Sequence, residues 1–123
     1  MMISKEVGVM LYVDDVAKEL DFWQAIGFHI IKSSDIDGYQ SFTMRPTMDS
    51  STLFTVYDKA FIEKVSPEVA DHQPSLLFET QELLQLYAKV SENAEDVSPM
   101  QTEPFPAFSF AAPSGHYYAV KGI

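Results

Sequence analysis

The chain is 123 residues long, enough for one domain with a buried core, and 46% of its residues are hydrophobic, unlike a disordered protein. Its formal net charge of −10 disfavours binding to nucleic acids, because their phosphate backbone repels an acidic surface. The chain holds no cysteine, which excludes disulfides, a thiolate nucleophile and zinc–thiolate sites.

Features of targeting and membrane insertion are missing from the sequence. No apolar stretch approaches the roughly 18–20 residues that cross a bilayer. Residues 1–6 do not combine a basic segment with a following apolar one, so they do not resemble a signal peptide. We therefore expect a cytoplasmic protein that does not enter the membrane. Its acidity serves solubility alone or attracts a cationic ligand.

The first elements are a strand over residues 6–13 and a helix over residues 15–26. Asp14 or Asp15 can accept a backbone N–H bond at the start of this helix. Gly27 follows the helix, where glycine most easily adopts the left-handed backbone of a helix end. The apolar residues of the helix recur at helical spacing and so share one face: Val16, Leu20, Trp23 and Ile26.

Three strands complete the first half, which therefore has the order β-α-β-β-β. We expect them over residues 28–33, 39–44 and 51–57. The pair Asp37-Gly38 between the first two is a typical hairpin turn.

Residues 58–73 do not continue this alternation of predicted strands and helices. Residues 59–65 could form a short helix, which Pro67 would end, and the remainder reads as a linker.

The same order of elements then begins again with a strand over residues 75–79. Thr80 can cap a second amphipathic helix, whose expected buried residues are Leu83, Leu86, Tyr87 and Val90. A short edge strand near residues 97–101 and strands over 105–111 and 116–121 complete the half.

An internal repeat of roughly 50 residues predicts two similar half-sheets. We expect a single domain over residues 1–123. Its first module covers about residues 5–57, its linker about residues 58–73 and its second module about residues 74–121.

Two motifs resemble those of the vicinal oxygen chelate superfamily, which contains glyoxalase I, extradiol dioxygenases, and fosfomycin- and bleomycin-resistance proteins. Val13-Asp14-Asp15, Phe22-Trp23 and Gly27-Phe28 are similar to its opening V-x-D…F-Y…L-G-F pattern, with one residue fewer before the glycine. Residues 108–116 are similar to its closing F-x-F-x-D-P-D-G-N turn, with Ala112 and Ser114 in place of both aspartates. The resemblance implies an α+β fold, in which two βαβββ modules form a curled, cup-like mixed sheet with the helices outside.

Metal-using members of this family bind a divalent ion through side chains on four strands. Counting from the two motifs, the resemblance places these four positions at Gly8, Phe54, Ser75 and Ala119. None of these side chains is a useful metal ligand. A shift of one residue restores no ligand, since the neighbours are Val7, Val9, Leu53, Thr55, Pro74, Leu76, Tyr118 and Val120. The resemblance thus implies a member that lacks the metal ligands, and we expect neither a metal nor another cofactor.

Three histidines remain, at positions 29, 72 and 116, and their spacing does not bring them together. They are surface or partly buried residues, or one of them contacts a ligand or acts in catalysis. No serine elbow, P-loop or G-x-G-x-x-G motif supports acyl transfer or nucleotide binding.

Strand alternation gives the side chains that we expect on the inner face of the cup: Gly8, Met10, Tyr12, Thr52, Phe54, Val56, Ser75, Leu77, Tyr117 and Ala119. From this set we predict the ligand-binding residues Met10, Tyr12, Phe54, Val56, Ser75, Leu77 and Tyr117. Such a lining suits a flat or apolar small molecule, and Phe54 could stack on an aromatic ligand. The alternative is that these side chains simply fill the cup as core.

Two functions follow from the resemblance. The first is a metal-independent protein, similar to the bleomycin-resistance branch, that sequesters a cationic or aromatic drug or metabolite and acts as a homodimer. The alternative is a glyoxalase- or dioxygenase-like enzyme with an unusual or absent metal site. The four ligand positions disfavour the enzyme, because its chemistry uses a metal as Lewis acid on vicinal oxygens.

Overall fold

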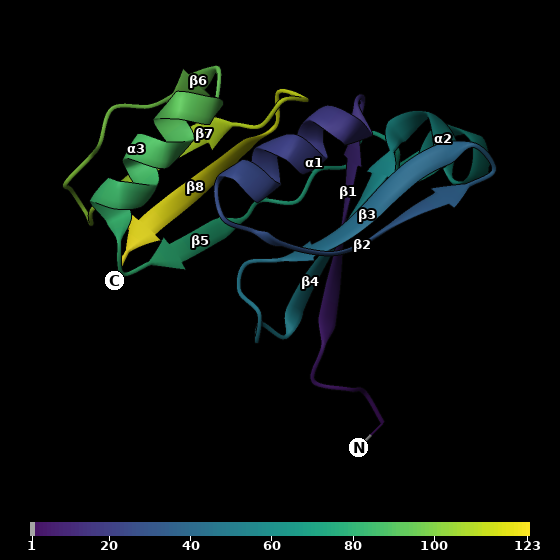
Figure 1. The fold of residues 1–123 in the computed structure, drawn as a ribbon, viewed down its shortest axis with the longest axis horizontal. Coiled ribbons are helices and arrows are strands. Elements are labelled where there is room, and N and C mark those ends of the chain that lie inside the picture. Colours follow the sequence, from purple (N-terminus) through teal and green to yellow (C-terminus); the bar gives the residue numbers. More distant parts are fainter. Residues whose placement is uncertain (1) are drawn as a thin grey trace. The chain divides into compact units, whose positions relative to one another are not determined.

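The computed structural model describes residues 2–123, which divide into two compact units, residues 2–73 and Pro74–Ile123. Each unit holds a four-stranded mixed sheet with a helix packed on it, and each repeats the order β-α-β-β-β (Figure 1). This confirms the predicted α+β fold of two βαβββ modules. Among the described residues, none of the helices combines the length and hydrophobicity that a membrane crossing requires.

Module one is built from β1 (Val7–Val13), β2 (His29–Ile36), β3 (Tyr39–Arg45) and β4 (Thr52–Asp58). The strand order across the sheet is β1-β4-β3-β2, so the first and fourth strands of the chain are neighbours. They run parallel, whereas β3 pairs antiparallel with both β4 and β2. The long connection that such a parallel pair needs runs from β1 to β4 and contains a helix, β2 and β3.

Helix α1 (Val16–Ala25) is one residue shorter at each end than the predicted helix over residues 15–26. Asp15, not Asp14, is its N-cap, and the Asp15 carboxylate accepts a bond from the Lys18 N–H. Gly27, just beyond the helix, has a φ of 109°, which glycine adopts without strain. The Gly27 N–H donates to the Gln24 carbonyl, which satisfies an otherwise unpaired end of the helix.

The core of module one lies between α1 and one face of the sheet. The register pairs Leu11 and Phe42 with Val56, which places their side chains on this face. Leu11, Phe42 and Val56 are buried, as is Trp23 on the facing side of the helix. We call the side of each sheet on which its helix packs the helix-covered face. The opposite side of each sheet is the open face.

Residues 58–73, which we expected to form a short helix and a linker, form α2 (Lys59–Val65) and the 3-10 helix η1 (Pro67–Val69). Both belong to the first compact unit. Asp58 caps α2 by accepting a bond from the Ala60 N–H at 2.9 Å.

Module two repeats the arrangement with β5 (Leu77–Thr80), β6 (Asp96–Val97), β7 (Ala107–Ala111) and β8 (Tyr117–Gly122) in the order β5-β8-β7-β6. Helix α3 (Leu83–Asn93) packs on this sheet, and its Tyr87 ring lies edge-on to Phe108 with centroids 4.9 Å apart. The predicted cap at Thr80 is wrong by two residues, because Glu82 is the N-cap. The Thr80 hydroxyl instead accepts a bond from the Glu82 N–H and closes the turn before the helix.

Candidate functional site

The open face of module one carries small and hydroxyl side chains around one exposed apolar residue. The parallel register pairs Met10 with Thr55, and Thr43 pairs with Thr55 from the other side. The two threonine hydroxyls are 3.4 Å apart. Met10 is 55% exposed, so its side chain is available to a ligand.

Two predicted binding residues of this module lie on the wrong face. Because Met10 pairs with Thr55, the adjacent residues Phe54 and Val56 point to the helix-covered face. Phe54 is only 3% exposed and its ring contacts Phe28, while Val56 is fully buried. The expectation that Phe54 and Val56 share a face with Met10 is therefore wrong, and both residues are core.

Tyr12 has the predicted orientation but is covered. It is buried in a small cluster with Ile62 of α2 and Ala70, and Phe61 packs against the same cluster. Its ring centroid lies 6.4 Å from that of Tyr57. Residues 58–73 thus close one end of the open face of module one.

The open face of module two exposes large apolar side chains. Leu77 pairs with Ala119 in the parallel register, and Tyr117 lies two residues before Ala119 on the same face. Leu77 and Tyr117 are 52% and 54% exposed. Ser75 lies before the start of β5 and is also exposed. Of the seven predicted binding residues, Met10, Leu77, Tyr117 and Ser75 thus remain accessible.

Tyr117 is fixed by a polar contact on the same face. Its hydroxyl donates a hydrogen bond to the Asp96 carboxylate of β6, across β7. This bond, together with the negative charge of Asp96, raises the pKa of Tyr117. The pair presents an aromatic ring beside a carboxylate, a combination that suits a cationic ligand.

Three of the four expected metal positions, Gly8, Phe54 and Ala119, lie on the two sheets, whereas Ser75 precedes β5. Gly8 pairs with Leu53, so Leu53 and not Phe54 faces the same side as Gly8. Ala119 pairs with Leu77. Residues 2–123 hold no group of three or more His, Asp or Glu side chains placed to bind a metal ion.

The three histidines lie in different surroundings. His29 in β2 accepts a hydrogen bond at its Nδ1 atom from the Arg45 Nε–H at 3.3 Å. His72 follows η1 and is exposed. His116 lies in the turn before β8, and its Nδ1 atom is buried without a hydrogen-bond partner among the described residues.

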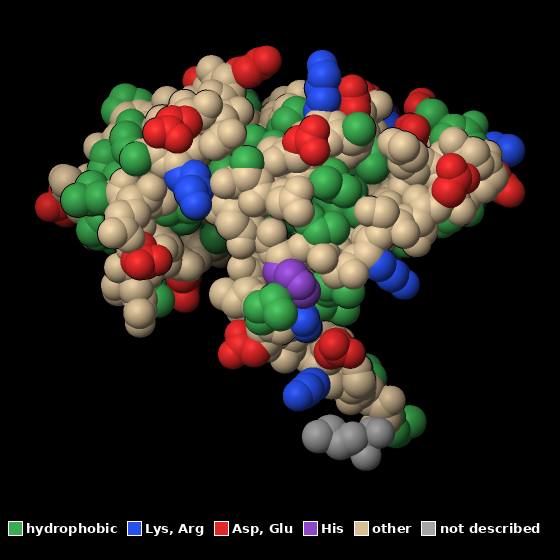
Figure 2. Space-filling model, in the orientation of Figure 1, with side chains coloured by type: hydrophobic (Ala, Val, Ile, Leu, Met, Phe, Trp, Pro, Cys, Tyr) green, Lys and Arg blue, Asp and Glu red, His purple; other side chains and the backbone are tan. Residues whose placement is uncertain are grey.

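Acidic side chains are dispersed over the visible surface and do not gather in one patch (Figure 2). They are separated by apolar and uncharged polar side chains. On the face that Figure 2 shows, the negative charge is therefore distributed over the surface and is not concentrated at one site.

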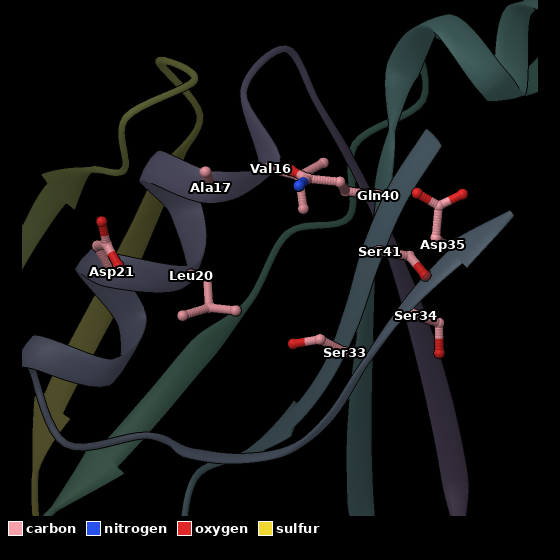
Figure 3. Close-up of a pocket in the computed structure, with 9 residues that line it drawn as sticks. All are labelled: Val16, Ala17, Leu20, Asp21, Ser33, Ser34, Asp35, Gln40 and Ser41. Atoms are coloured by element: carbon pink, nitrogen blue, oxygen red, sulfur yellow. The ribbon is translucent and has the colours of Figure 1, made fainter. Parts of the chain in front are cut away.

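Module one also contains a pocket that the sequence did not predict. It has a volume of about 410 Å³ and lies between α1 and the hairpin of β2 and β3 (Figure 3). Its lining residues are Val16, Ala17, Leu20, Asp21, Ser33, Ser34, Asp35, Gln40 and Ser41. One signal was present in the sequence: β2 places polar residues, Ser33 and Asp35, at alternate positions where a fully packed strand would be apolar.

Comparisons with known proteins agree with the two motifs. The family model of the Glyoxalase/Bleomycin resistance protein/Dioxygenase superfamily matches residues 7–120. A comparison with curated proteins found no match.

Solved structures share the fold over nearly the whole chain. TnmS3, an antibiotic binding protein from Streptomyces sp. CB03234, is 19% identical with a TM-score of 0.78, covering 99% of this chain and 98% of that one. A superfamily member from Sphaerobacter thermophilus DSM 20745 is 19% identical with a TM-score of 0.77, and both chains are covered completely. The E126Q mutant of the fosfomycin resistance protein FosX from Listeria monocytogenes, complexed with Mn(II) and 1S,2S-dihydroxypropylphosphonic acid, is 10% identical with a TM-score of 0.65, covering 98% and 92%.

At these identities the neighbours establish the fold alone. The family match, by contrast, extends over most of the chain and includes both motifs. The chain therefore belongs to the glyoxalase/bleomycin resistance protein/dioxygenase superfamily.

Proposed function

We propose that this protein binds a small organic molecule on its open faces without the help of a metal ion. The observation that carries the proposal is the exposure of two large apolar side chains, Leu77 and Tyr117, on one sheet face beside the small Ala119. Apolar and aromatic side chains with a few polar groups are the usual lining of ligand sites. TnmS3, which has the same fold, is described as an antibiotic binding protein.

The ligand that this face favours is aromatic and cationic. The Tyr117 ring offers a surface for stacking, and the Asp96 carboxylate that it contacts attracts a positive charge. Ser109, the strand partner of Ala119, adds a hydroxyl group. We propose that the protein sequesters such a compound rather than transforming it.

Side-chain chemistry supports the metal-independent part of the proposal. Gly8 and its strand partner Leu53 offer no oxygen or nitrogen donor, and neither do Leu77 and Ala119. Dialysis against zinc, nickel and manganese followed by elemental analysis should leave no stoichiometric metal. Stoichiometric uptake, with turnover of a vicinal-oxygen substrate, would instead support the glyoxalase- or dioxygenase-like enzyme.

The binding site can be tested with a panel of basic aromatic antibiotics in a thermal unfolding assay. A specific ligand at about 100 times its Kd adds about 2.7 kcal/mol to the free energy of unfolding. Leu77→Ala should weaken binding by about tenfold, which corresponds to about 1.4 kcal/mol. The matched control is Leu84→Ala, because Leu84 is an exposed leucine (76%) on α3 and not on the sheet. Equal effects of both substitutions, or no binding of any compound, would contradict the proposal.

We further propose a homodimer. In sheet one the outer strands are β1 and β2, and in sheet two they are β5 and β6, so each has one edge without a strand of its own sheet. Such edges are usually covered in stable proteins. Sedimentation equilibrium across a range of protein concentrations would give the mass, and a monomer throughout would refute the dimer.

A further inference from the structure

The pocket of module one lies on the opposite side of its sheet from the open face. Ser33 pairs with Phe42, whose side chain belongs to the helix-covered core, and Asp35 pairs with Gln40 two residues along. Ser33, Asp35 and Gln40 therefore share the helix-covered face. A molecule in this pocket would not touch the open-face residues Met10 or Thr55.

The two walls of the pocket differ in chemistry. Helix α1 supplies the apolar side chains of Val16, Ala17 and Leu20. Figure 3 shows the Leu20 and Ser33 side chains pointing toward each other across the gap, and the Gln40 amide reaching toward Val16. The hairpin thus opposes the apolar wall with a hydroxyl group and an amide.

Ser34 and Ser41, which also belong to the lining of the pocket, differ from Ser33 in the direction of their side chains. Ser34 and Ser41 pair with each other in the register, and in Figure 3 both side chains point away from α1. Their side chains therefore face the open side of the sheet, since alternate residues of a strand face opposite sides. This difference between Ser33 and Ser34 provides a matched pair for an experiment.

The charge of the lining is entirely negative. Its nine residues include Asp21 and Asp35 but no Lys, Arg or His. One Asp35 oxygen accepts a bond from the Gly38 N–H at 2.9 Å, and its exposed carboxylate retains capacity for a second donor. Asp21 lies at the rim, on the side of α1 away from Ser33 in Figure 3.

We propose that this pocket is a second ligand site, which binds a small organic amine with a compact apolar body. The apolar part lies against Val16 and Leu20, and the ammonium group lies by the Asp35 carboxylate, with Ser33 and Gln40 as further polar partners. The volume of about 410 Å³ falls within the usual range of ligand sites, about 300–1,000 Å³. This site is independent of the proposed open-face site.

The probes are three compounds with one cyclohexyl body and different charge: 2-cyclohexylethylamine, 2-cyclohexylethanol and cyclohexylacetate. Each is titrated into the full chain while backbone amide shifts are followed by NMR. We expect saturable shifts at Ala17, Ser33 and Ser34 with the amine. The alcohol should bind about fivefold more weakly, and the carboxylate more weakly still. Equal binding of amine and alcohol, or no saturable shifts at these residues, would overturn the proposal.

Substitutions locate the site. Ser33→Phe should fill the pocket and abolish the amine-induced shifts, whereas Ser34→Phe, on the same strand but facing away, should leave them. Both positions are exposed, and strands tolerate aromatic residues, so both variants should fold. Equal loss in both variants would refute binding in this pocket.

A second pair of substitutions tests the role of the Asp35 carboxylate in binding the amine. Asp35→Asn keeps an oxygen for the Gly38 N–H but should remove the fivefold preference for amine over alcohol. Asp37→Asn makes the same charge change in the turn, outside the lining, and should preserve the preference. A preference that survives Asp35→Asn would contradict the assigned role of this carboxylate. Leu77→Ala should leave amine binding unchanged, so failure of either site can be told from failure of the other.

Discussion

Trp23 and Phe28 contact each other twice at the end of α1. The Phe28 N–H donates to the Trp23 carbonyl at 2.9 Å, and the two ring centroids are 4.7 Å apart. With the bond from the Gly27 N–H to the Gln24 carbonyl, this is the Schellman arrangement, completed by its usual hydrophobic contact. The chain therefore leaves the helix in a fixed direction and enters β2.

Gly27→Ala should destabilise the protein by about 1–2 kcal/mol. An added Cβ at Gly27 would meet no atom within 4 Å, so the cost would come from the backbone φ of 109° rather than from a clash. Gly8→Ala is the control, since Gly8 also has open space but ordinary strand geometry. Urea unfolding, followed by the fluorescence of Trp23, measures both variants. Equal stability of the two would contradict this explanation.

The two neighbouring aspartates before α1 should differ in their effect on stability. Asp15→Ala removes the acceptor of the Lys18 N–H and should cost about 1 kcal/mol of unfolding free energy. Asp14→Ala should change it by less than about 0.5 kcal/mol, as surface substitutions usually do. A larger loss with Asp14→Ala in the same urea assay would show that the cap is assigned to the wrong residue.

Glu19 is a buried carboxylate within module one, only 1% exposed. It accepts a hydrogen bond from the Trp23 Nε1–H at 2.8 Å, one helical turn away. Glu19→Ala should cost about 2–4 kcal/mol of unfolding free energy, because it removes the acceptor of the Trp23 Nε1–H bond and opens a cavity. Glu19→Gln keeps an oxygen acceptor and should cost clearly less. Similar losses for Ala and Gln in chemical denaturation would show that the indole hydrogen bond is not the main contribution.

The hydrogen bond between Tyr117 and Asp96 predicts a pH dependence at alkaline pH. Because it raises the folded-state pKa of Tyr117, the folded protein keeps a proton that the unfolded chain releases at its ordinary pKa of about 10. The resulting stabilisation is fully present below about pH 10 and is lost as the pH rises through the folded-state pKa.

Tyr117→Phe removes this titrating group, so its stability should fall less steeply than that of the wild type as the pH rises above about 10. Urea midpoints at several pH values measure the difference. Tyr39→Phe, which removes a phenol from module one, controls for the general effect of one tyrosine fewer. Parallel pH profiles for the wild type and Tyr117→Phe would contradict the prediction.

Sequence patterns predicted the helices and the order of strands because their signals are local. Asp15 and Gly27 mark the two ends of α1 within a few residues of the bonds that they make or permit. The opening and closing motifs then fixed the family. The start of α3 was harder to predict from the sequence. A threonine hydroxyl that closes a turn, as Thr80 does, occurs in the same sequence context as one that caps a helix.

The candidate site was predicted less well because it depends on register between distant strands. Alternation shows which residues of one strand share a face, but it does not show whether Met10 aligns with Phe54 or Thr55. Residues 52–57 mix apolar and hydroxyl side chains at both alternate sets of positions, so the sequence offered no clear choice. The burial of Tyr12 by Ile62 and Ala70 likewise could not be predicted, because it depends on contacts between residues that are far apart in the sequence.

The strand orders β1-β4-β3-β2 and β5-β8-β7-β6 have a consequence for synthesis on the ribosome. In each module the strand translated last lies between two others, so neither sheet can close until its final strand has left the exit tunnel. Until then β1 and β5 have no parallel neighbour, and their apolar side chains stay open to other chains. Module one can complete its sheet while module two is still being made, which gives the folding of this chain a direction from its amino end to its carboxyl end.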